Sequence, residues 1–257
     1  MNLFFNMKVS IITSCYNRES TIGECIESVI SQDYPFIEYI VIDGASKDRS
    51  LEIIKHYEDK IAQIISEPDH GMYEAINKGL KIATGDIIGL VHSDDLLFST
   101  HTISDLVKVF EQNNTDLVYG NGLFVSNSDK SKVVRNWISG KYSRLKVRMG
   151  WLPLHPTVYI KKSCFEKMGL YNENYKIAAD SELLVRYLYK AHLKVNYLNE
   201  YIVKMRMGGI STNRKTRKRM WNEDIRLYRH YKIHPAILIK LLKMGWKIPQ
   251  FITAKFK

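Results

Sequence analysis

The sequence has few cysteines, no long hydrophobic run and almost no acid at its carboxyl end. The three cysteines, Cys15, Cys25 and Cys164, are odd in number, and none stands in a CxxC pair or at metal-ligand spacing. A disulfide framework is therefore not expected, and a reducing compartment is the simpler interpretation. No stretch reaches the ~18 apolar residues of a spanning helix. The opening MNLFFNMK is too short for a signal-peptide apolar core, so we expect a cytoplasmic protein.

Positive charge is concentrated at the carboxyl end. The formal net charge is +11, and from Arg214 onward 13 Lys/Arg residues face only Glu223 and Asp224. A basic tail indicates nucleic acid, a membrane surface or a polyanionic substrate as partner. The whole chain of 257 residues, 45% hydrophobic and 25% charged, has ordinary globular composition and fits one large α/β domain with a small appendage.

Apolar strands alternate with helical patterns in the first hundred residues. The β-branched runs predict buried strands, and the segments between them carry apolar residues at helical spacing. This β-α-β-α-β-α-β order is typical of a mostly parallel sheet with helices on both faces, which binds ligands at the carboxyl ends of its strands. The expected strands are 8–14, 37–42, 61–65 and 87–91, and the expected helices follow Thr21, run through Leu51 and Ile54, and cover 71–84.

The second half has a more mixed pattern. It predicts helices near 103–110, from a Ser163 cap to Gly169, and after Asp180. It also predicts strands at 117–119 and 157–160, and a hairpin of 123–126 with 132–137. The one composition break falls near Gly208-Gly209.

Polar side chains follow three successive strands of the predicted sheet. Asp43 follows the second strand, Asp69 follows the third, and His92, Asp94 and Asp95 follow the fourth. Carboxylates gathered at one sheet edge repel each other unless something positive binds there, and a divalent metal would resolve this. The alternative for each Asp alone is a helix cap or a turn residue.

Six segments in the same order resemble glycosyltransferase family 2, of the bacterial polysaccharide type. They are SIITSCYNRE (10–19), VIDGASKDRS (41–50), EPDHGMYEAINKGLKIATGD (67–86), HSDD (92–95), LHPTVYIKKSCFEKMGLYNENY (154–175) and AADSELLVR (178–186). The resemblance implies the GT-A fold, a Rossmann-like, mostly parallel central sheet flanked by helices. It implies a catalytic domain over 1–207, with a nucleotide-sugar-binding half (8–99) and an acceptor-binding half (100–207). A helical basic extension, 208–257, would follow.

The resemblance also implies a nucleotide site at the first three strand ends. The residues expected to hold the nucleoside are Thr13, Tyr16, Asn17, Arg18 and Asp43. Those expected to line the nucleoside and diphosphate are Asp69, Asn77 and Lys78, although Lys78 would equally suit a solvated helix face.

The metal motif of the family is Asp-x-Asp, and this chain has His92-Ser93-Asp94 in its place. The second acid, kept as Asp94, is the one expected to touch a divalent ion, Mn²⁺ or Mg²⁺, and imidazole suits Mn²⁺ better. His92 either joins the ion or donates to the ribose or phosphate. Asp95 either orients Asp94 or touches the donor sugar. His155 is expected at the diphosphate or the metal, with a structural role as the alternative.

Asp180 aligns with the catalytic base of the family, and Ala179 replaces the acid before it. The implied reaction is inverting transfer of a sugar from a nucleotide-diphosphate donor to a glycan or lipid-linked acceptor. The resemblance favours a UDP-sugar as the donor, with GDP or dTDP as the alternative nucleotides. Glu182 is the rival base. Two other functions remain open: nucleotide-sugar binding without turnover, and another nucleotide-dependent transferase. No GxGxxG motif follows the first strand, which disfavours dinucleotide binding.

The carboxyl-terminal segment 235–257 has an amphipathic pattern. Its apolar stripe is flanked by Lys240, Lys243 and Lys247, which favours contact with an anionic membrane at the inner face of the plasma membrane. The alternative is a helix packed on the catalytic domain with its lysines in water. No nucleic-acid-binding motif accompanies the charge, so nucleic acid is not expected. The apolar stripe consists of Ile237, Leu238, Leu241, Leu242 and Trp246.

Overall fold

The structure is a computed structural model that describes residues 7–127, 129, 131–208 and 216–256. Within these ranges nine strands form one sheet in the order β3-β2-β1-β4-β8-β6-β9-β5, and β7 pairs with β6. The strands are β1 (Val9–Cys15), β2 (Ile37–Asp43), β3 (Gln63–Ser66), β4 (Ile87–Leu90), β5 (Asp95–Leu97), β6 (Leu117–Val125), β7 (Val133–Trp137), β8 (Tyr159–Lys161) and β9 (Val195–Arg206).

The first four strands run parallel, as the sequence predicts. β1 pairs with β2 and β4, and β2 pairs with β3, all in the parallel sense. Beyond β4 the sheet is mixed: β8 is antiparallel to both β4 and β6, β6 is parallel to β9, and β9 is antiparallel to β5. The α/β class is therefore confirmed, and the loops after β1, β2, β3 and β4 begin at the same edge of the sheet.

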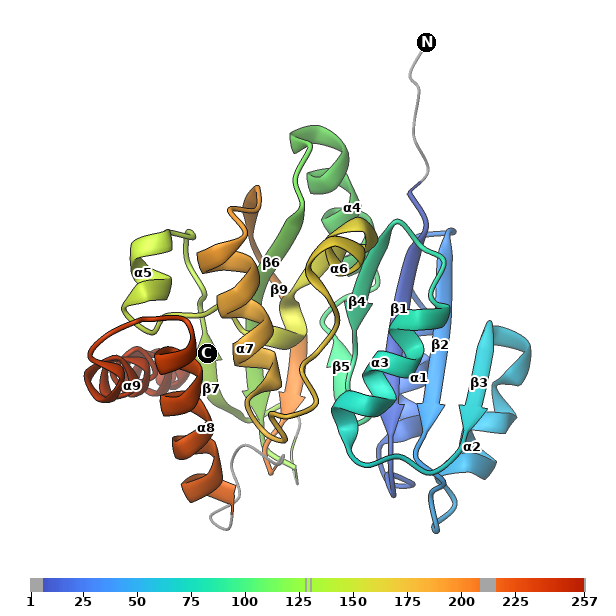
Figure 1. Cartoon of the computed structure of the whole chain (residues 1–257). Helices are drawn as coiled ribbons and strands as arrows, with labels where there is room; N and C mark the ends of the chain where they lie inside the picture. The colour runs from blue at the N-terminus through green and yellow to red at the C-terminus, as the bar shows by residue number, and fades with distance from the viewer. Residues whose placement is uncertain (1–6, 128, 130, 209–215, 257) are drawn as a thin grey trace.

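Helices cover both faces of the sheet (Figure 1). Consecutive side chains of β1 enter opposite cores. Ile11 joins the cluster under α1 (Ile22–Ile30) and α4 (Thr102–Asn113), whereas Ile12 joins the cluster under α3 (Met72–Ile82) and α7 (Ala179–Val185). A strand buried on both faces carries apolar residues on both, which explains Val9, Ile11 and Ile12. The buried Ser10 between them donates its hydroxyl to Glu38 at 2.5 Å. The helices of this part are α1 (Ile22–Ile30), α2 (Ser50–His56), α3 (Met72–Ile82), α4 (Thr102–Asn113), α5 (Arg144–Arg148), α6 (Lys162–Met168) and α7 (Ala179–Val185), with short turns η1 (Glu58–Lys60), η2 (His155–Thr157) and η3 (Arg186–Lys190).

Several local predictions differ from the structure. The segments predicted as separate strands, 117–119 and 123–126, join in one strand, β6, which ends at Val125 and whose second part forms the predicted hairpin with β7. Thr21 precedes α1 but makes no capping bond, because its hydroxyl points back to the carbonyl of Arg18. Ser163 lies inside α6, which begins at Lys162. The strands β5 and β9 were not predicted.

The carboxyl-terminal helices fold back onto the domain. They are α8 (Arg217–His230), α9 (Ala236–Gly245) and α10 (Ile248–Thr253), followed by η6 (Ala254–Phe256). The carboxylate of Glu223 in α8 accepts three backbone N–H groups, from Lys176, Ile177 and Ala178, at 2.9–3.1 Å. These bonds fix α8 to the loop that enters α7. Residues 209–215, at the start of the predicted extension, lie outside the described residues.

No helix in the described ranges combines the length and the apolar character needed to cross a membrane. The three cysteines are free and buried.

Candidate active site

The loops after β1 and β2 are held together by hydrogen bonds at the strand ends. The backbone N–H of Asn17 donates to the hydroxyl of Ser46 at 2.9 Å, and that of Arg18 donates to the hydroxyl of Ser50 at 2.7 Å. Asn17 has a φ of 51°, in the left-handed region that Asn tolerates better than most residues. The sharp turn lets its amide oxygen accept the N–H of Lys47 at 2.8 Å. These hydrogen bonds fix the conformation of the predicted nucleoside loop.

Tyr16, Asp43 and Asp69 lie around Gly44. Asp43 is fully buried and accepts the hydroxyls of Ser46 at 2.5 Å and Ser66 at 2.7 Å. A Cβ on Gly44 would lie 2.4 Å from Oδ2 of Asp69 and 3.4 Å from the Tyr16 ring. Only glycine leaves room for this approach. The ring of Tyr16 is 55% exposed, so an aromatic face and a carboxylate are available beside the strand ends.

Three of the predicted nucleotide residues are already occupied by protein contacts. Thr13 is fully buried, and its hydroxyl donates to the carbonyl of Val91 at 2.8 Å. The amide of Asn77 exchanges hydrogen bonds with the backbone of Tyr171, at 2.9 and 3.0 Å. Lys78 forms ion pairs with Glu67 at 2.9 Å and Glu74 at 3.4 Å. These side chains support the loops around the site.

Asp94, Asp180, His92 and His155 come together at the end of β4. The rings of His92 and His155 stack at 6.3 Å between centroids. Burial lowers the pKa of His92, while the carboxylates of Asp94 and Asp180 act to raise it. Burial lowers the pKa of His155 to about 4, with Asp180 again opposing. Both imidazoles are therefore neutral at neutral pH, between two carboxylates that lie 86 residues apart in the sequence.

The backbone at the start of α7 orients Asp180. Its Oδ1 accepts the N–H of Ser181 at 2.6 Å, and its own N–H donates to the hydroxyl of Tyr73 at 3.5 Å. The rival Glu182 points elsewhere. It is 3% exposed and accepts Arg186 at 3.1 Å and the hydroxyl of Tyr231 at 2.5 Å. A carboxylate paired in this way is not free to take a proton, so the geometry favours Asp180.

Asp95 lies in the protein interior. It is 2% exposed, and its Oδ2 has no hydrogen-bond partner among the described residues. Burial first, and then the charge of Asp94, raise the pKa of Asp95 well above its usual range. The backbone N–H of Asp95 donates to the carbonyl of His92 at 2.8 Å, which closes the turn after β4.

The residues at this edge suit a divalent ion only in part. No group of three His, Cys, Asp or Glu side chains in the described part of the chain is arranged to hold an ion by itself. Asp94 supplies one half-buried carboxylate, and the neutral imidazoles of His92 and His155 are potential nitrogen ligands. However, Nε2 of His155 lies 2.7 Å from the Tyr171 hydroxyl. An ion here needs further oxygen ligands, which a donor diphosphate carries.

Sequence reasoning missed the groups that surround Asp180. Tyr73 and Tyr171 stack at 5.7 Å, and Asp180 raises the pKa of both beyond the effect of burial. The hydroxyl of Ser181 accepts Lys243 of α9 at 2.8 Å. No spacing in the sequence links these segments, since the contact depends on how α9 packs.

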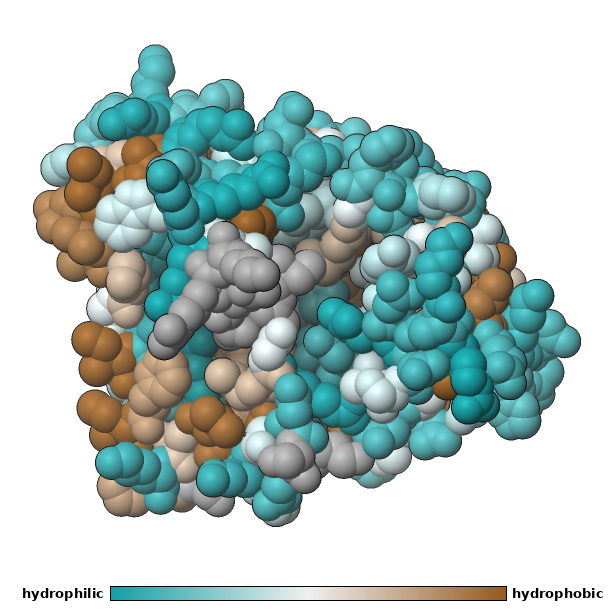
Figure 2. All heavy atoms as spheres, turned by 90° about the horizontal axis from the view of Figure 1, so that it is seen from below, coloured by the Kyte–Doolittle hydropathy of each residue, from teal (hydrophilic) through white to brown (hydrophobic). Residues whose placement is uncertain are grey.

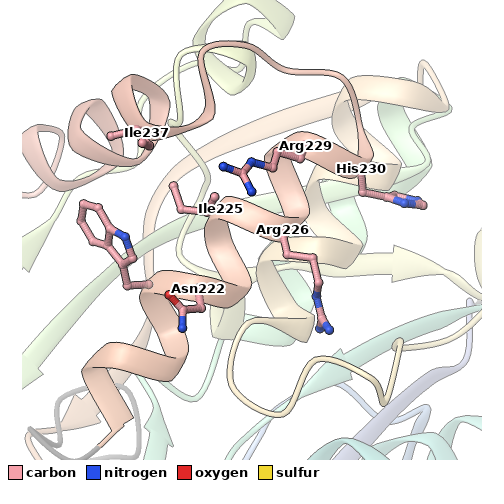
Figure 3. A pocket seen from close by; sticks show the side chains of 7 residues that line it. Asn222, Ile225, Arg226, Arg229, His230 and Ile237 are labelled. Carbon is pink, nitrogen blue, oxygen red and sulfur yellow. The ribbon is translucent and has the colours of Figure 1, made fainter.

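A separate hollow of about 600 Å³ lies on α8 and α9 (Figure 3). It is lined by Trp221, Ile225, Arg226, Arg229 and His230 of α8 and by Ile237 of α9. None of the predicted site residues lines it.

Comparisons with known proteins agree on family and fold. The family model described as "Glycosyl transferase family 2" matches residues 10–169, more than half of the chain. The chain is 25% identical over 207 residues to a "PGL/p-HBAD biosynthesis glycosyltransferase" of Mycobacterium bovis, covering 79% of this chain and 78% of that protein.

Two solved structures share the fold at low sequence identity. TarS 1-349 of S. aureus, in complex with UDP-GlcNAc, has a TM-score of 0.69 at 18% identity, over 97% of this chain and 73% of that one. The mannosyltransferase PcManGT of Pyrobaculum calidifontis, in complex with GDP-Man and Mn²⁺, has a TM-score of 0.68 at 16% identity, over 98% and 74%. The expected GT-A fold is confirmed.

Proposed function

The chain belongs to glycosyltransferase family 2, and we propose that it transfers a sugar, with inversion, from a UDP-sugar to an acceptor hydroxyl, with Asp180 as general base. The observation that carries this proposal is the convergence of Asp180 with Asp94 beside the neutral imidazoles of His92 and His155. In this arrangement Asp94 would act on the sugar donor, and Asp180 would act on the acceptor hydroxyl.

The donor nucleoside would lie against Tyr16, with Asp43 and Asp69 accepting from its N–H and hydroxyl groups. The close approach around Gly44 supports this placement, because it leaves an aromatic face next to a carboxylate. Two proteins of the same fold bind UDP-GlcNAc and GDP-Man, which supports a nucleotide-sugar donor. Asn17 and Arg18 would hold the loop, and Thr13, Asn77 and Lys78 would support it from behind.

A divalent ion, Mn²⁺ or Mg²⁺, would be held by Asp94 together with the donor diphosphate. When bound, the ion offsets the negative charge that grows on the leaving diphosphate. His92 and His155, being neutral, would offer a lone pair to the ion or an N–H to a phosphate oxygen. The Mn²⁺ in the PcManGT complex supports this assignment.

Asp180 would take the proton from the acceptor hydroxyl. The hydroxyl oxygen attacks the anomeric carbon from the face opposite the diphosphate, and the bond from that carbon to the diphosphate oxygen breaks. The electron pair leaves with the nucleoside diphosphate, and the configuration at the anomeric carbon inverts. The Ser181 N–H holds the carboxylate in one orientation for this step.

The acceptor would be a glycan or a lipid-linked glycan at a membrane surface. Apolar side chains, each at least 49% exposed, gather on the outward side of the last helices, and Figure 2 shows apolar surface along the side where α9 lies in Figure 1. The cations of α8 adjoin it, since Ile237 borders the hollow with Arg229. A peripheral membrane contact would bury this face. Its residues are Ile237, Leu238, Leu241, Met244, Ile248, Phe251, Ile252 and Phe256.

The decisive experiment is calorimetric titration of UDP with Mn²⁺ and then with chelator, followed by transfer assays with UDP-sugars. We expect metal-dependent UDP binding that Asp94→Ala abolishes, and transfer that Asp180→Asn abolishes while UDP still binds. Tight UDP binding without transfer to any acceptor would instead indicate a nucleotide-sugar-binding protein. Binding of GDP in place of UDP would overturn the choice of base.

Membrane contact has its own test. The Leu238→Ser/Leu241→Ser double variant should lose flotation with phosphatidylglycerol-containing vesicles. The control Phe36→Ser, which changes an apolar residue 42% exposed near β2, should keep it. Equal flotation of both variants would show that Leu238 and Leu241 do not bind the membrane, and would contradict this part of the proposal.

A further inference from the structure

Helix α9 has Lys240 and Lys243 on its inner face beside the buried Ala236 and Ile239, and a second set of apolar residues on its outer face. Lys240 is 4% exposed, and the side chain of Lys243 is 14% exposed. On the opposite face Leu238, Leu241 and Met244 are about half exposed. A helix of a globular protein normally places its lysines on the solvent side and keeps apolar residues away from that side. The prediction that Lys240 and Lys243 lie at the edge of the apolar stripe is therefore wrong: both side chains point into the protein.

The inward lysines outnumber the acids that face them. Asp224 of α8, 1% exposed, accepts Lys240 and, at 2.7 Å, Lys243. Lys247 lies one turn beyond Lys243 and has no hydrogen bond or ion pair from its ammonium group to the described residues. Burial first, and then the charge of Lys243, lower the pKa of Lys247 to about 8. Asp224 thus pairs with two of the three ammonium groups in this region.

Arg135 of β7 adds a fourth cation to this region. It is 8% exposed, and its guanidinium carbon lies 4.7, 4.4 and 5.3 Å from the ring centres of Phe124, Trp137 and Phe251. Its Nε donates to Gln250 at 2.5 Å, but its buried Nη2 has no partner in the described part of the chain. A buried charged donor without an acceptor is costly, and an anion would satisfy it.

The cationic cluster, Arg135, Lys243 and Lys247, extends to the candidate base. The Nζ of Lys243 donates to the hydroxyl of Ser181, next to Asp180. Burial would lower the pKa of Lys243, but the carboxylates of Asp224 and Asp180 raise it, so this lysine stays charged. The cationic cluster and Lys240 together carry four cationic groups. Of the carboxylates that the structure describes, only those of Asp180 and Asp224 lie beside them.

We propose that the cationic cluster is a subsite for a phosphate group of the acceptor, placed next to Asp180. A phosphate supplies the one or two negative charges that the region lacks, and guanidinium and ammonium groups are its usual donors. Because the outer face of the same helix is apolar, we take the phosphate to belong to a lipid-linked acceptor. Its phosphate would lie at Lys243 and Lys247 while its sugar hydroxyl reaches Asp180. This inference rests on the proposed function.

The test measures protection of Lys247 by a phosphate ester in the full-length protein, with UDP and Mn²⁺ saturating the donor site. At pH 8 an amine-reactive acylating reagent is applied, and labelling of each lysine is followed by mass spectrometry. Hexyl phosphate should slow the acylation of Lys247 at least fivefold and leave that of the exposed Lys255 unchanged. Hexanol, which lacks the charge, should protect neither. Equal labelling of Lys247 with and without hexyl phosphate would overturn the subsite.

Two matched variants test the charge itself. Lys247→Met keeps the apolar stem and removes an unpaired cation, so it should fold as well as the parent and bind hexyl phosphate at least tenfold more weakly. Lys255→Met should bind as the parent does. Unchanged affinity in Lys247→Met would contradict the proposal.

The remaining outcomes separate this inference from the proposed function. If UDP binds and hexyl phosphate does not, the subsite fails and the donor site stands. If hexyl phosphate binds through Lys247 in a protein that does not bind UDP, the subsite stands and the donor assignment fails. Protection of Lys247 by phosphatidylglycerol vesicles but not by hexyl phosphate would make the cluster a headgroup site and overturn its assignment to the acceptor.

Discussion

Lys243 of α9 donates a hydrogen bond of 2.8 Å to the hydroxyl of Ser181, the residue that follows Asp180 in α7. The two residues lie 62 positions apart, and one belongs to the segment expected to be a separate basic extension. Because Glu223 also binds the loop before α7, helices α8 and α9 hold both sides of the candidate base. The carboxyl-terminal helices therefore contribute to the candidate site as well as to the outer surface.

Exchanging each of the two acids of α7 for its amide should affect different properties: the transfer rate for Asp180 and the stability for Glu182. Asp180→Asn should lower the transfer rate by about 10²- to 10⁴-fold, the usual contribution of general base catalysis, with little change in stability. Glu182→Gln should lower the free energy of unfolding by about 3 kcal/mol, because Arg186 would lose its buried partner. Urea unfolding and initial rates measure both. A folded Glu182→Gln protein without transfer activity would make Glu182 the base.

Adding one methyl group at Gly44 should weaken donor binding. In Gly44→Ala the new Cβ would displace the Asp69 carboxylate, which it would otherwise meet at 2.4 Å. We expect the Kd for UDP to rise about tenfold, or about 1.4 kcal/mol, with the fold intact. Gly23→Ala is the matched control, since its Cβ would make only an ordinary contact at 3.6 Å with Ile53. Equal UDP affinity in both variants would remove Asp69 from the nucleoside site.

The parallel half of the fold could be predicted because its strands are buried on both faces. The runs before Asp43 and Asp94 have apolar residues at neighbouring positions, which indicates strands buried on both faces. The alternation of strands and helices then places both acids at the same edge of the sheet. The strands β5 and β9 gave weaker signals. β5 has three residues, and most residues of β9 are only half-buried, so their pairing depends on partners distant in sequence.

The candidate site was predictable only where its residues follow strands. Asp94 follows β4, but Asp180 was found through resemblance alone, since nothing local distinguishes it from Glu182. The partner that separates them, Tyr231, lies 49 residues beyond Glu182. The pattern of one helix predicts Lys243 only at the edge of an apolar stripe. Its burial depends on Asp224, which lies on another helix and which this pattern cannot reveal.

The stability of the sheet should depend on the charge of Glu38 in acid. Burial alone would raise the pKa of Glu38. Hydrogen bonds from Lys8, Ser10 and Thr84 have the larger, opposite effect, so the pKa falls from the usual 4.5 to about 2. Because the folded state keeps Glu38 ionised, the contribution is complete above pH 4.5 and is lost as the pH falls toward 2. We expect a loss of about 2 to 3 kcal/mol over that window.

Glu38→Gln isolates this term from the other carboxylates. The parent should lose more unfolding free energy than Glu38→Gln when the pH falls from 6 to 3, as measured by urea unfolding at each pH. Parallel losses in the two proteins would mean that Glu38 titrates alike in the folded and unfolded states.

Docking of α9 should fail when Gly150 receives a side chain. Gly150 has a φ of 83°, and a Cβ there would lie 2.6 Å from the carbonyl oxygen of Ile239 and 3.0 Å from the backbone N of Lys243. Gly140 has a similar φ of 69° but open space around it. Gly140→Ala should therefore cost only the left-handed backbone penalty of about 1 to 2 kcal/mol. Gly150→Ala should cost more, because α9 must also move.

Movement of α9 has a consequence for the chemistry. If Lys243 leaves Ser181, Gly150→Ala should show faster proteolysis within 231–256 and a lower transfer rate than Gly140→Ala at equal folded concentration, while both bind UDP alike. Limited proteolysis, initial rates and UDP titration measure the three quantities. A Gly150→Ala protein that is cleaved faster but transfers sugar at the parental rate would show that Asp180 works without Lys243. Transfer lost together with UDP binding would instead indicate damage that spreads to the donor side of the sheet.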